Sequence, residues 1–107
     1  AFLLTHFYLK ALLHSHHPDA ILDQVATFWG NYTTALGSHA NADIESRTAR
    51  LILCLLLARV HGKSPVEYLT ESNQREFITT FASQHLSSPP PQLASLTSLW
   101  RDGLQTL

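Results

Sequence analysis

The sequence predicts an all-α fold, a bundle of about five to six helices. Apolar residues recur at three- and four-residue spacing along almost the whole chain. No segment of useful length alternates apolar and polar residues as a strand does. Glycine, proline and short polar stretches separate the apolar segments, as they do at helix ends. We therefore expect a single helical domain over residues 1–107.

The first half of the chain contains three predicted helices. The first covers residues 2–13 and ends before Pro18, because proline disfavours helix in the residue that precedes it. Pro18 opens the second helix, whose apolar face continues to residue 36, and Gly37 suits its C-terminal end. The third helix begins near residues 41–43, where Asn41 or Asp43 can cap it, and runs to about residue 61.

The third helix is predicted to be the central, buried one. It is apolar nearly all round over residues 51–57. Cys54 lies inside this stretch, which favours a small buried hydrophobic residue. A single cysteine excludes a disulfide framework, and it fits a reduced compartment such as the cytoplasm.

Two longer helices and one short helix are predicted in the second half. The short helix covers residues 65–70, the next runs from Ser72 or Asn73 to about residue 86, and residues 87–91 form a rigid connector. The last helix lies within 91–107. The residues expected to face inward in these two longer helices are Phe77, Ile78, Phe81, Leu86, Leu93, Leu96, Leu99, Trp100 and Leu104.

Composition excludes several functions and indicates a covered surface. Net charge is −1 and the pI is about 6.7, so there is no basic footprint for nucleic acid. The longest unbroken apolar stretch, residues 51–58, is far shorter than the roughly 20 residues that span a bilayer. Charged residues make up 14% of the chain, against about 25% in a typical soluble domain. Part of the surface is therefore expected to pack against something else, and the absence of methionine indicates a segment of a longer protein.

One corner of the chain combines charge with helix capping. Ser64 and Glu67 form a capping box with proline at the first helical position, and Arg59 and Lys63 lie just before it. A helix N-terminus flanked by cations can hold a substrate anion. The alternative is a purely structural corner with solvated cations. Arg59, Lys63, Ser64 and Glu67 are therefore the candidate site residues.

A second cluster lies between the first two helices. His14, His16, His17 and Asp19 are of ligand type for zinc, although their spacing matches no known closed site. The alternative is a solvated, polar helix end. His17-Pro18-Asp19 is also the tripeptide that J-domain co-chaperones carry between two helices, which gives a stand-alone interaction module as a competing interpretation. A structural scaffold without a ligand is the third.

Residues 58–69 (ARVHGKSPVEYL) resemble the late segment of the aminoglycoside phosphotransferase and methylthioribose kinase superfamily. Residues 1–11 (AFLLTHFYLKA) resemble the helix that follows the metal-binding aspartate in that family. His61 departs from the pattern, where an acidic residue is more usual.

The resemblance implies that the chain is the helical C-terminal part of a kinase-like fold, inactive alone. The intact protein would transfer the ATP γ-phosphate to a small-molecule hydroxyl with the help of Mg²⁺. The motifs for this chemistry would lie outside the chain, so the resemblance assigns no catalytic, cofactor-binding or metal-binding residue to it. The implied partner is the rest of the catalytic domain, and an apolar face left exposed would favour a homo-oligomer.

Overall fold

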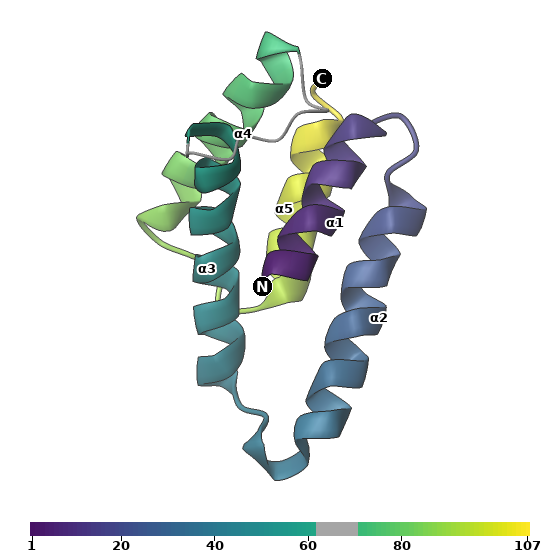
Figure 1. The fold of residues 1–107 in the computed structure, drawn as a ribbon, viewed down its shortest axis with the longest axis vertical. Helices are drawn as coiled ribbons and strands as arrows, with labels where there is room; N and C mark the ends of the chain where they lie inside the picture. Colours follow the sequence, from purple (N-terminus) through teal and green to yellow (C-terminus); the bar gives the residue numbers. More distant parts are fainter. Residues whose placement is uncertain (62–70) are drawn as a thin grey trace.

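The computed structural model describes residues 1–61 and 71–107, and these residues form five α-helices without a strand (Figure 1). The predicted all-α fold is confirmed. The short helix predicted at 65–70 lies outside the described residues. The helices are α1 (Phe2–Leu13), α2 (Asp19–Leu36), α3 (Ala42–His61), α4 (Ser72–Leu86) and α5 (Leu93–Leu104), with a 3-10 turn, η1 (Gly37–His39), between α2 and α3.

Local sequence signals set several helix ends. Gly37 has a φ of 56°, and its N–H bonds to the carbonyls of Thr33 and Thr34, which ends α2. The Asn41 Oδ1 atom accepts a hydrogen bond of 2.9 Å from the backbone N–H of Ile44, so Asn41 caps α3. Both helix ends agree with the sequence pattern.

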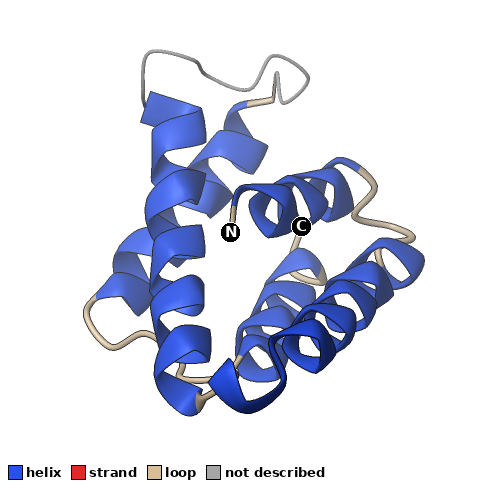
Figure 2. Ribbon diagram, turned by 60° about the horizontal axis from the view of Figure 1, so that its bottom comes forward, coloured by secondary structure: helices blue, strands red, loops and turns tan. Residues whose placement is uncertain are grey.

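The helices form two packed pairs, α1 with α2 and α3 with α4, and α5 packs against α2 and α3. α1 and α2 form an antiparallel hairpin, and α3 then returns along the other side of α1 (Figure 1). α5 lies between α2 and α3, and α4 packs along α3 (Figure 2). In the described part of the chain, no helix is long and apolar enough to cross a bilayer.

Trp100 of α5 occupies the centre of the core and is fully buried. Its ring packs edge to face against the ring of Tyr8 in α1, with the two ring centroids 5.6 Å apart. It packs in the same way against Phe77 and Phe81 of α4, with centroid distances of 4.9 Å each. Its indole N–H donates to the backbone carbonyl of Tyr8 at 3.0 Å. The Tyr8 and Thr97 hydroxyls share a hydrogen bond of 2.7 Å. These contacts join the first and last helices and leave the polar atoms of the two buried aromatic residues satisfied.

Close packing continues along α5 to Gly103. A Cβ atom added at Gly103 would lie 2.7 Å from Phe77 Cε1, so a larger residue here would force the Phe77 ring to shift. Phe77 in turn contacts the Trp100 ring. The packing of the Phe77 and Trp100 rings therefore also depends on Gly103, one turn further along α5.

The prediction that α3 is the central, buried helix is confirmed only in part: it packs against α1, α4 and α5, but one side of it is exposed. Ile52, Leu53 and Leu56 are buried, but the Leu51 side chain is 49% exposed and Cys54 is exposed. α1, α4 and α5 cover only part of the helix circumference, so the residues on the remaining stripe face outward. An apolar run shows that a helix can be buried, but it does not show how many neighbours the helix has.

One prediction for the last helix, α5, is also wrong. Leu99, which we expected to face inward, is 37% exposed. Leu93, Leu96, Trp100 and Leu104 are buried and follow the three- and four-residue spacing of a single face. Leu99 lies next to Trp100 in sequence but turns about 100° away from it around the helix.

The two sides of α3 give a matched test of this arrangement. Leu53→Ala should lower the free energy of unfolding by about 2–5 kcal/mol, because Leu53 is fully buried. Leu55→Ala should lower it by under about 2 kcal/mol, since Leu55 is only half-buried. Denaturant titration measures both. Equal losses would mean that both sides of α3 are covered.

A second test uses the buried phenol. Burial raises the pKa of Tyr8 to about 12, and the hydrogen bond with Thr97 offsets part of this rise. The pKa of tyrosine in the unfolded chain is about 10. Above that value the unfolded chain loses the proton while the folded chain keeps it. The stability contributed by Tyr8 is therefore complete below about pH 10 and is lost as the pH rises through about 12.

The free energy of unfolding should thus fall by roughly 2–3 kcal/mol between pH 10 and pH 12 through this group. Tyr8→Phe should remove that part of the fall, whereas Tyr32→Phe, at an exposed site, should retain it. The measurement is urea denaturation at a series of pH values. If the free energy of unfolding fell by the same amount with pH in Tyr8→Phe and in the unchanged chain, the result would contradict the burial of the phenol.

Candidate functional site

The corner predicted from the sequence is described only in part. Lys63, Ser64 and Glu67 lie outside the described residues, so the anion site stays a prediction. Arg59 lies in the last turn of α3, half-buried, and lines a small hollow with residues of α1. The hollow has a volume of about 20 Å³, enough for about one water molecule.

The end of α3 is held by α4. Arg75 donates a hydrogen bond of 3.1 Å from Nη2 to the carbonyl of Val60. His61 Nε2 and Thr79 Oγ1 share another of 2.8 Å. The arginine supplies a partner and a positive charge to a helix C-terminus, where both are favourable. These described contacts are structural in character.

The histidine cluster is not assembled as a metal site. Across residues 1–61 and 71–107, no group of three His, Cys, Asp or Glu side chains is placed to hold a metal ion. The segment instead joins α1 to α2: the His17 N–H bonds to the carbonyl of His14, and Pro18 precedes the first residue of α2. Asp19 Oδ1 accepts a hydrogen bond of 3.0 Å from Nε of Arg101. The aspartate of the His-Pro-Asp tripeptide is therefore paired within the chain.

A larger groove lies between α2 and α5, next to the start of α3. Its volume is about 390 Å³, which is within the range of small-molecule sites. The floor is mainly apolar, and polar side chains lie along its length. The lining residues on α2 are Leu22, Asp23, Val25, Ala26, Trp29 and Gly30, with Glu45 from α3 and Leu93, Ala94, Thr97, Ser98 and Arg101 from α5.

One end of the groove carries a three-residue charge cluster. Arg101 Nε lies 3.0 Å from Asp19 Oδ1, and its Nη2 lies 3.9 Å from Asp23 Oδ1. The Arg101 side chain is 33% exposed, whereas both carboxylates are largely exposed. Two carboxylates therefore share one guanidinium, and this end keeps a net negative charge.

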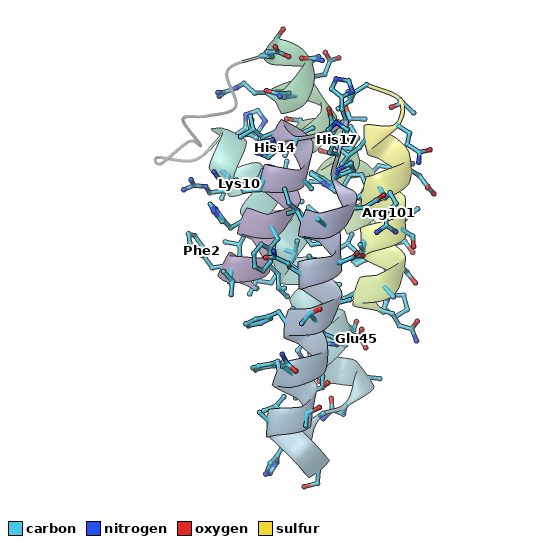
Figure 3. All side chains as sticks on the ribbon, turned by 90° about the vertical axis from the view of Figure 1, so that its right-hand side faces the viewer. Phe2, Lys10, His14, His17, Glu45 and Arg101 are labelled. Carbon is cyan, nitrogen blue, oxygen red and sulfur yellow. The ribbon has the colours of Figure 1, made fainter. Side chains whose placement is uncertain are left out.

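Glu45 marks the other end. Its Oε2 atom accepts a hydrogen bond of 2.9 Å from the backbone N–H of Leu93, the first residue of α5. A carboxylate at a helix N-terminus satisfies an unpaired N–H group and interacts favourably with the helix dipole. Figure 3 shows Arg101 and Glu45 at separate heights on the side of α2 along which α5 runs.

The polar side chains of the groove make contacts between helices. Among its lining residues, no hydrogen bond joins a hydroxyl to a carboxylate or an imidazole, which is the arrangement that activates a nucleophile. Thr97 instead bonds to Tyr8, which fixes α5 against α1. No motif in the sequence marks this groove. Arg101 is 82 residues from Asp19, and Glu45 is 48 residues from Leu93, so no local pattern brings them together.

The structure also exposes aromatic side chains. Phe2 is 66% exposed and projects from the first turn of α1 (Figure 3). Phe28 and Tyr32 of α2 stack on each other at 6.2 Å, and they are 36% and 42% exposed. We call these three residues the aromatic surface.

Comparison with models of known families finds no match, and neither curated proteins nor solved structures contain a significant match.

Proposed function

We propose that the chain is the helical C-terminal part of an ATP-dependent phosphotransferase that acts on a small-molecule hydroxyl. The observation that carries the proposal, beside the resemblance of residues 1–11 and 58–69, is the aromatic surface. In this proposal that surface packs against the rest of the catalytic domain. The lobe then supports the catalytic site from behind and does not itself supply reacting groups.

The position of the aromatic surface supports a covered interface. Positions 21, 25, 28 and 32 lie along one face of α2. Near the α1–α2 connection this face is covered, since Ile21 is half-buried and Val25 is buried. α1 has 12 residues and α2 has 18, so α2 continues past the start of α1 (Figure 1). Phe28 and Tyr32 are on this continuation, where the described part of the chain covers the apolar face only partly.

Composition supports the same interpretation. Only 14% of the residues are charged, and apolar residues make up 45%. Leu51 and Leu3 are also exposed, at 49% and 44%. Packing against a larger domain would remove this apolar area from water.

The proposal places ATP and Mg²⁺ on the remainder of the domain. ATP would supply the phosphoryl group and Mg²⁺ would neutralise its developing charge. The contribution of this chain would be to hold the neighbouring elements in position.

The aromatic surface can be tested in two contexts. In the isolated chain, Phe28→Ser with Tyr32→Ser should lower the free energy of unfolding by about 2–3 kcal/mol, because both rings are partly exposed. In the longer protein that the proposal expects, the same pair should destabilise by about 5 kcal/mol or more, because the rings would be buried at an interface. The exposed Thr27→Ser is the matched control in both contexts.

A second test of the proposal is the coding sequence of the gene. The coding DNA upstream of Ala1 should contain a His-x-Asp loop, a following asparagine, and an aspartate just before Ala1. The encoded protein should transfer phosphate from ATP, and the 107-residue chain should not. Strong transfer by the chain alone, or a start codon directly before Ala1, would contradict the proposal.

A further inference from the structure

We draw no further inference here: the strongest candidate, the aromatic surface formed by Phe2 on α1 and by Phe28 and Tyr32 on α2, already serves as the interface in the proposed function, and nothing in the structure shows what else covers it.

Discussion

The structure depends on the contact between Tyr8 and Trp100. The indole N–H of Trp100 donates to the Tyr8 carbonyl, the two rings meet edge to face, and the Tyr8 hydroxyl bonds to Thr97. The two chain positions are 92 residues apart, so the contact closes almost the whole chain into one unit. Phe77 and Phe81 complete the ring cluster from α4. Both polar atoms are buried, and each would be costly to leave unpaired.

This contact also positions the groove. Thr97, which bonds to Tyr8, and Arg101, which bonds to Asp19, lie on α5 four residues apart. The first holds α5 against α1 and the second holds it against α2. Glu45 fixes the start of α5 from α3. The groove between α2 and α5 is thus bounded by helices that are tied at three points, and its shape should be largely preformed.

Local signals in the sequence predicted the elements well. Gly37 and Asn41 have the roles that their residue types favour at helix ends, and α4 begins at Ser72 as expected. The all-α class followed from apolar periodicity alone. Cys54 shows the limit of the same reasoning, because periodicity identifies a helix face but not the number of neighbours that cover it.

The candidate sites could be predicted far less well. The groove depends on pairs that are distant in sequence, Arg101 with Asp19 and Glu45 with Leu93, and neither pair leaves a local pattern. The anion site at Arg59, Lys63, Ser64 and Glu67 remains a prediction. The histidines near Asp19 are the opposite case: they lie close together in the sequence and suggest a metal site. In the described structure, however, they do not come together as a group of metal ligands.

Hydrogen exchange of the two indole N–H groups tests the role of the Tyr8–Trp100 contact most directly. If the contact holds the whole unit together, Trp100 should exchange only through global unfolding. Its opening free energy would then equal the free energy of unfolding from denaturant titration, and that of the half-buried Trp29 would be far smaller. A Trp100 indole that opens at several kcal/mol below the global value, while the amide of Leu53 stays protected, would show that α5 detaches from a core that survives without it.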